Sequence, residues 1–237
     1  MVLSVSMWPF VVSVGSFMAV LGAVLMVSWA LIGGLMMLAM GFGMWAEEDQ
    51  IKWIGVVGEA GQSGSSLGVL IFIFTEMMFF LSLMVSGVYL VDGWDAGEVV
   101  DMQEVPLFIS MILLSSGVTI TVAHQFMHSG RSSEAGVWGG VTILLGVLFV
   151  SVQYGEWREN WFELFDGVGG SLFYFVTGFH GLHVMLGLSL NLVLFVLLVG
   201  GGFSEVSGWK TEGVVWYWHF VDVVWLFVYL VVYWYCM

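Results

Sequence analysis

Two carboxylates lie within otherwise apolar stretches of this 237-residue chain, and they are the first residues that could carry chemistry. Glu76 lies in the middle of the run from Ala60 to Val91, which holds no other charge, and Asp222 lies in an apolar segment near the carboxyl end. A carboxylate is costly wherever its surroundings are lipid. Both residues therefore need a reason, which is chemistry, proton movement or the joining of helices.

Histidines share these apolar stretches. His180 and His183 lie one helical turn apart in FHGLH, and His219 and Asp222 have the same spacing in WYWHFVD, so each pair would share a helix face. Two such histidines can chelate a metal, and two facing histidines can hold haem iron. Polar contacts between helices are the commoner use of these residue types. The other two of the five histidines are His124 and His128. The residues alone favour helix joining and leave ligation open.

Glu76 has three interpretations. Its role would be to carry protons, to pair with a histidine of a neighbouring span, or to bind lipid headgroups. A proton relay needs titratable groups all the way across the membrane, and this chain offers few. A transporter of protons or ions that acts alone is therefore the second hypothesis, and a haem-binding redox protein is the third.

Composition places the whole chain in a membrane. It is 60% hydrophobic and only 9% charged, whereas about a quarter of a soluble domain is charged. The 18 acidic and 4 basic residues give a net charge of −14, which argues against nucleic acid as a partner. The single cysteine, Cys236, excludes an internal disulfide and a cysteine-based metal site.

The apolar runs predict a single transmembrane domain, residues 1–237, with seven helical spans. We expect a turn at Ser28–Gly34 and a flexible connector at Glu47–Gly64. Three of the four basic residues lie in loops on the side of the amino terminus, which places that terminus on the cytoplasmic or matrix side. The expected spans are 8–27, 31–45, 66–91, 106–127, 135–154, 169–199 and 213–235.

Several long segments resemble subunit III of cytochrome c oxidase. The strongest are TGFHGLHVMLG, residues 177–187, and WYWHFVDVVWLFVYLVVYW, residues 216–234. EVPLFISMILLSSGVTITVAHQFM at 104–127, FTEMMFF at 74–80 and WPF at 8–10 follow. The match is dense from Glu104 to the end and thinner before it. Ordered strings of this length are far more specific than a short motif.

The resemblance implies an all-α integral membrane bundle of seven transmembrane helices, with a two-helix part, a five-helix part and a lipid-filled V-shaped cleft. It implies a non-catalytic core subunit of the terminal respiratory enzyme, which reduces oxygen to water and pumps protons. The chain would bind phospholipids, contact subunit I, and support its proton uptake and stability. Haem and copper would lie in partner subunits, among which are subunits I and II and accessory subunits. The location would be the mitochondrial inner membrane, with the amino terminus on the matrix side.

The expected site residues follow from the same motifs. We expect no catalytic residue and no metal ligand on this chain. A stretch that usually carries arginine in the family is acidic here, MWAEEDQIKW at 44–53, so few basic residues remain to hold lipid phosphates. The expected buried polar network is Glu76, His124, His180, His183, His219 and Asp222. The expected lipid-binding residues are Trp45, Lys52, Glu76, His183 and Lys210.

Overall fold

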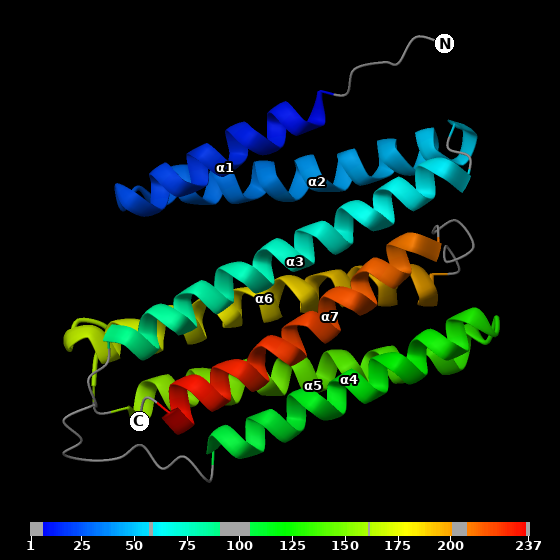
Figure 1. Ribbon diagram of the computed structural model, residues 1–237. Coiled ribbons are helices and arrows are strands. Elements are labelled where there is room, and N and C mark those ends of the chain that lie inside the picture. Colours follow the sequence, from blue (N-terminus) through cyan, green and yellow to red (C-terminus); the bar gives the residue numbers. More distant parts are fainter. Residues whose placement is uncertain (1–6, 57–58, 91–104, 161, 201–207, 236–237) are drawn as a thin grey trace. The chain divides into compact units, whose positions relative to one another are not determined.

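The computed structural model describes residues 7–56, 59–90, 105–160, 162–200 and 208–235. These ranges are helical almost throughout and contain no β-strand, so the predicted all-α class is confirmed (Figure 1). The helices are α1 (Trp8–Val24), α2 (Ser28–Val56), α3 (Glu59–Leu90), α4 (Val105–His128), α5 (Ser132–Glu159), α6 (Gly167–Val199) and α7 (Gly208–Val228). A π-helical segment, η2 (Tyr229–Tyr235), continues α7.

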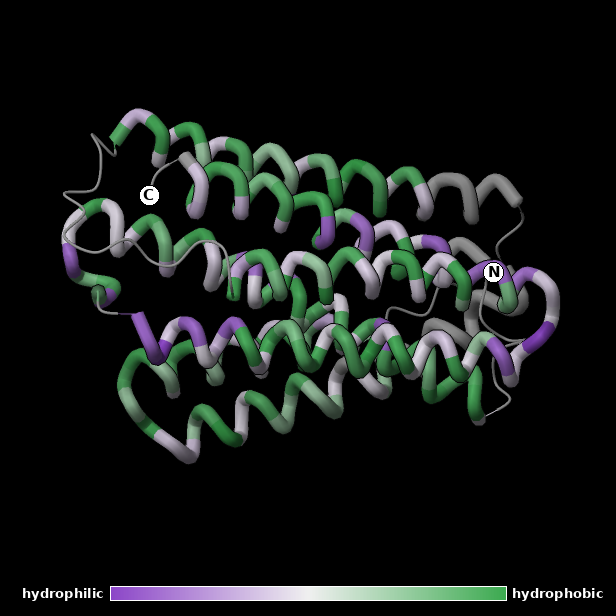
Figure 2. The backbone as a smooth tube through the Cα atoms, turned by 90° about the horizontal axis from the view of Figure 1, so that it is seen from below, coloured by the Kyte–Doolittle hydropathy of each residue, from purple (hydrophilic) through white to green (hydrophobic). Residues whose placement is uncertain are grey.

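Hydrophobic residues run along the length of the helices, and hydrophilic residues gather near several of the turns (Figure 2). Among the described residues, five helices are long and apolar enough to cross a membrane. Two further apolar stretches, Trp8–Val24 and Ser28–Gly41, are shorter. The chain is therefore a helical membrane bundle, while the seven individual spans and their limits stay predictions. The five long stretches are Ser66–Leu90, Val105–His128, Ser132–Glu159, Gly167–Val199 and Lys210–Trp234.

The chain divides into two compact units, Met1–Gly61 and Gln62–Met237. The first unit contains α1 and α2, and the second contains almost all of α3 together with α4 to α7. This division follows the expected two-helix and five-helix parts. The lipid-filled cleft expected between those parts stays a prediction.

In the first unit, α1 and α2 pack with their backbones in close contact. A Cβ added at Gly34 would lie 2.7 Å from the Cα of Ala19, and one added at Gly22 would lie 2.7 Å from the Cα of Leu31. The expected turn at 28–34 was wrong, because the chain reverses at 25–27, where Met26 has a φ of 55°. Gly34 serves helix packing instead of a turn, as small residues commonly do between membrane helices.

The expected connector at 47–64 was also wrong. The helix α2 continues to Val56, and α3 begins at Glu59, so most of this segment is helical. Glutamate, glutamine and lysine are good helix formers, and a glycine within a helix costs only about 1 kcal/mol. Loss of hydrophobicity in this sequence therefore marks the end of an apolar stretch and not the end of a helix.

In the second unit, α7 is the central helix. It contacts α4 and α6, and half of its apolar stretch is buried inside the protein, compared with 11% for α3. The helix α3 buries Phe80 and Met84 and leaves most of its other large apolar side chains exposed. The largest fully buried side chains of this core include Trp218, Trp225, Tyr233, Phe80, Phe149, Phe162 and Phe173.

Candidate functional site: polar contacts between the helices

Glu76 of α3 faces His183 of α6. The Oε2 atom of Glu76 lies 3.3 Å from Nε2 of His183, while Nδ1 of His183 lies 2.9 Å from the carbonyl oxygen of Phe179. Because a carbonyl oxygen only accepts, Nδ1 carries a proton and donates it there. The carboxyl group of Glu76 and Nε2 of His183 are thus the polar groups that face each other between α3 and α6.

Aromatic rings enclose the histidine of this pair. The rings of Phe80 and Phe179 lie 5.2 and 4.7 Å from that of His183, both edge-on, and Tyr217 stacks at 6.3 Å. The side chain of His183 is 7% exposed and that of Glu76 is 25% exposed. The imidazole of His183 therefore lies within the protein on α6, and the carboxyl group of Glu76 approaches it from α3, which is mostly exposed.

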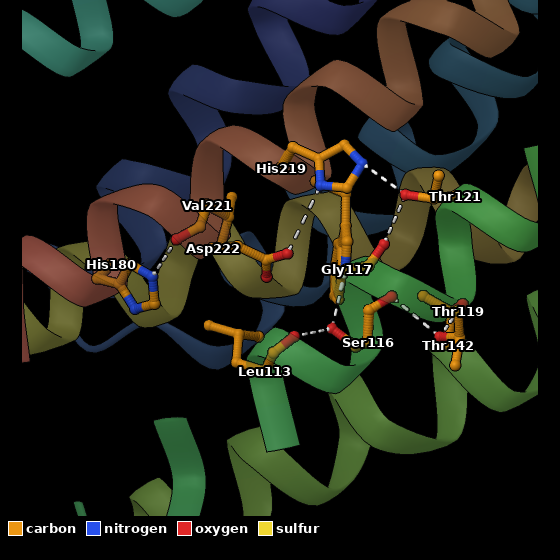
Figure 3. Close-up of polar contacts among 11 residues, drawn as sticks. Leu113, Ser116, Gly117, Thr119, Thr121, Thr142, His180, His219, Val221 and Asp222 are labelled. Atoms are coloured by element: carbon orange, nitrogen blue, oxygen red, sulfur yellow. Dashed lines mark hydrogen bonds and ion pairs between the residues drawn. The ribbon is translucent and has the colours of Figure 1, made fainter. Parts of the chain in front are cut away.

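His180, one turn earlier on α6, makes a different contact. Its Nε2 donates to the carbonyl oxygen of Val221 on α7 at 3.1 Å, and its Nδ1 is buried without a hydrogen-bond partner. Figure 3 shows the ring pointing toward Val221. The rings of Phe149 and Trp225 pack around it at 5.8 and 5.0 Å. The two histidines of FHGLH therefore tie α6 to two different helices.

His219 of α7 meets Thr121 of α4, and Asp222 faces His219 from one turn further along α7 (Figure 3). The hydroxyl of Thr121 donates to the carbonyl oxygen of Gly117 at 2.9 Å and accepts from Nε2 of His219 at 3.2 Å. Oδ2 of Asp222 lies 3.8 Å from Nδ1 of His219, which is an ion-pair distance and too long for a hydrogen bond. The contacts join α4 to α7 and leave Oδ1 of Asp222 buried without a partner.

Gly117 allows this approach, because Asp222 lies directly over its Cα and a Cβ there would collide with Oδ2. We expect Gly117→Ala to lower the free energy of unfolding by about 1–3 kcal/mol. Gly139 is the matched control, since a Cβ there would lie 3.8 Å from Phe195, an ordinary van der Waals distance. Unfolding of the full chain in mixed detergent micelles measures both variants. An equal effect of the two substitutions would contradict the proposed collision.

Hydroxyl groups of α4 hold the tryptophans of α7. Nε1 of Trp218 donates to Oγ of Ser116 at 3.0 Å, and Nε1 of Trp225 donates to Oγ of Ser110 at 2.9 Å. The sequence analysis did not identify these contacts. A signal for them exists, because tryptophans seven residues apart occupy one helix face, where buried indole N–H groups need acceptors.

A second polar cluster was also missed. Nε2 of Gln153 donates to Oε2 of Glu156 at 2.9 Å and lies 3.5 Å from the hydroxyl of Tyr233 in η2. Glu156 is only 7% exposed. The expected fifth span ends at residue 154, so this carboxyl group was assigned to a loop, whereas α5 continues to Glu159. The spacing of Gln153 and Glu156, one turn apart, was the available signal.

The remaining candidate residues lie apart from these contacts. His124 contacts His128, at the end of α4, with 3.1 Å between their Nε2 atoms. Lys210 is partly exposed near the start of α7, and the side chains of Trp45 and Lys52 lie outside the described part of the chain. The described side chains include no group of three or more His, Cys, Asp or Glu that could hold a metal ion. The six residues expected as one buried polar network thus lie in separate contacts.

These features define the class of protein as an integral membrane bundle whose polar groups connect its helices. The family model described as cytochrome c oxidase subunit III matches residues 1–237. The chain belongs to this family, whose members are a core subunit of an oxidoreductase complex.

Curated relatives support the same family. A "Cytochrome c oxidase subunit 3" of Drosophila yakuba is 32% identical over 97% of this chain and 94% of its own length. That of Paracentrotus lividus is 34% identical with the same coverage. That of Lycodon semicarinatus is 40% identical over 73% of this chain and 70% of its own length.

Proposed function

We propose that this chain serves the oxidase as a structural and lipid-binding subunit and transfers no electrons itself. The observation that carries this proposal is the use of the polar residues, since Glu76, His180 and His219 each bond to another helix of the same unit. Side chains that form contacts between helices stabilise the bundle. They leave electron transfer to haem and copper in partner subunits.

The direct partner in this proposal is subunit I, with subunit II and accessory subunits in the same complex. The exposed apolar side chains of α3 and α5 would bury against a subunit or against phospholipids. The complex would lie in the mitochondrial inner membrane, with the amino terminus of this chain on the matrix side. Glu76, a quarter exposed beside a buried histidine, and Lys210 would contact lipid. Trp45 and Lys52 remain proposed lipid contacts on the basis of sequence alone.

Replacement of Glu76 tests the structural role. We expect Glu76→Ala to leave the initial rate of electron transfer in the assembled oxidase within about twofold of wild type, because in this proposal the pair with His183 joins helices and the redox centres lie in other subunits. Stopped-flow measurement of haem reduction gives this rate. Glu76→Gln, which keeps a hydrogen-bonding group beside His183, is the control for assembly. Loss of haem reduction in a correctly assembled Glu76→Ala oxidase would overturn the proposal.

Two further measurements distinguish the proposed role from the alternatives. The chain should co-purify with a larger haem-bearing subunit, and the isolated chain should have no haem absorption spectrum. Vesicles that contain the isolated chain should show no proton or ion flux. A coloured chain would support a redox subunit, and a chain that passes current would support a transporter.

A further inference from the structure

His124 and His128 form a histidine pair at the carboxyl end of α4, four residues apart on one helix face. Their Nε2 atoms lie 3.1 Å apart and their ring centroids 4.5 Å apart. His128 is exposed and His124 is partly exposed, so the pair lies at the surface of this unit. None of the contacts that join α4 to α7 described above uses either side chain.

The separation of the two nitrogens suits a metal ion. Imidazole nitrogens bind zinc at about 2.0–2.1 Å, so two of them on one ion, at angles between 90° and the tetrahedral value, lie about 2.8–3.4 Å apart. The observed 3.1 Å falls within that interval. The two Nε2 atoms already lie at this separation, so binding one ion needs a change of tautomer and a rotation of the rings that turns both lone pairs toward the metal.

The proton balance also permits binding. In the hydrogen bond between the rings, one Nε2 donates and the other accepts. Metal binding requires that the donor ring carry its proton on Nδ1 instead. A neutral imidazole can carry its proton on either ring nitrogen, so this change of tautomer leaves both Nε2 atoms free to bind a metal.

The surroundings favour a cation. The pair occupies the last two turns of α4, where the helix dipole places partial negative charge. Two groups of α7 interact electrostatically with His124: Glu212 favours positive charge there, and His219 acts in the opposite sense. The helix dipole and Glu212 attract a divalent ion, while the two imidazoles select a transition metal over magnesium or calcium.

We propose that His124 and His128 bind one divalent transition-metal ion through their Nε2 atoms, with Cu²⁺ bound more tightly than Ni²⁺ or Zn²⁺. Among the described residues no third His, Cys, Asp or Glu completes the site, so water supplies the remaining ligands. Such a site is exchangeable, unlike a structural zinc site with four protein ligands. The proposal departs from our sequence-based expectation of no metal on this chain.

Titration of the full chain with Cu²⁺ in detergent tests the proposal, with electron paramagnetic resonance to count bound nitrogens. We expect the wild-type chain to bind one Cu²⁺ with two equatorial nitrogens. His124→Gln and His128→Gln should each bind it at least about tenfold more weakly, because each loses the chelate effect. Circular dichroism verifies that both variants keep their helicity, and the two variants test the site independently.

Moving one histidine provides the matched control. The double variant His128→Gln with Gln125→His keeps five histidines but places the second imidazole one residue from His124, where it cannot face the first. We expect this variant to bind Cu²⁺ as weakly as His128→Gln. Equal affinity of the control and the wild type, or no two-nitrogen signal in the helical wild-type chain, would overturn the proposal.

Discussion

Replacing Trp218 with alanine is expected to lower the free energy of unfolding of the second unit by about 3–5 kcal/mol. The indole is fully buried and donates to Ser116 of α4. A Cβ added at Gly146 of α5 or at Gly187 of α6 would lie 3.0 Å from its ring atoms. The side chain of Trp218 thus fills the space beside these two glycines. Its loss opens a cavity in contact with α4, α5 and α6.

Unfolding of the full chain in mixed micelles, followed as the fraction of SDS rises, measures this effect. Trp234→Ala is the matched control, because that side chain is 69% exposed. We expect the control to change the free energy of unfolding by no more than about 0.5 kcal/mol. Ser116→Ala separates the hydrogen bonds from the cavity, since it removes the acceptor for Trp218 and the donor to the carbonyl oxygen of Leu113 but keeps the indole in place. Equal losses for Trp218→Ala and Trp234→Ala would show that the central position of Trp218 is not the cause.

The pair of Glu76 and His183 is expected to give the second largest effect. His183→Ala leaves the carboxyl group of Glu76 without its partner and should cost about 3 kcal/mol or more. In the double variant with Glu76→Ala the orphaned group is gone, so the losses of the two single variants should not add. We expect a coupling free energy of about 1–2 kcal/mol, the upper range for polar contacts between membrane helices.

His180 supplies the control for this double-mutant cycle. It lies on the same helix face as His183 but donates to Val221, so its coupling to Glu76 should be no more than about 0.5 kcal/mol. The same micelle unfolding measurement serves the wild type, the three single variants and the two double variants. Coupling of Glu76 to His180 as strong as to His183 would contradict the contact that the structure assigns.

Much of the architecture follows from the sequence. Long uncharged runs predict apolar helices, because only a structure that satisfies its own backbone hydrogen bonds is stable in lipid. The spacing of His219 and Asp222 places both on one helix face, and they do lie together in the structure. Family motifs add the identity of the complex. The ends of the helices were harder to predict from the sequence, since α2 and α5 continue past the apolar residues that predicted their ends.

The partner of each polar side chain was decided by the tertiary structure. The sequence indicates that Glu76 needs a partner and that His180 and His183 share a face, but only the register of α3 against α6 selects His183. The burial of Glu156 beside Gln153 likewise depends on how α5 meets η2.

The physical reason is that lipid tails and protein cores are equally apolar. A soluble helix shows its buried face by the contrast between hydrophobic and polar residues, whereas most faces of these helices are apolar. The sequence by itself therefore determined that the chain forms apolar helices in a membrane, and which residues on one helix lie together. Side-chain shape, glycine contacts and a few hydrogen bonds between helices decided the rest, and these exist only in the folded chain.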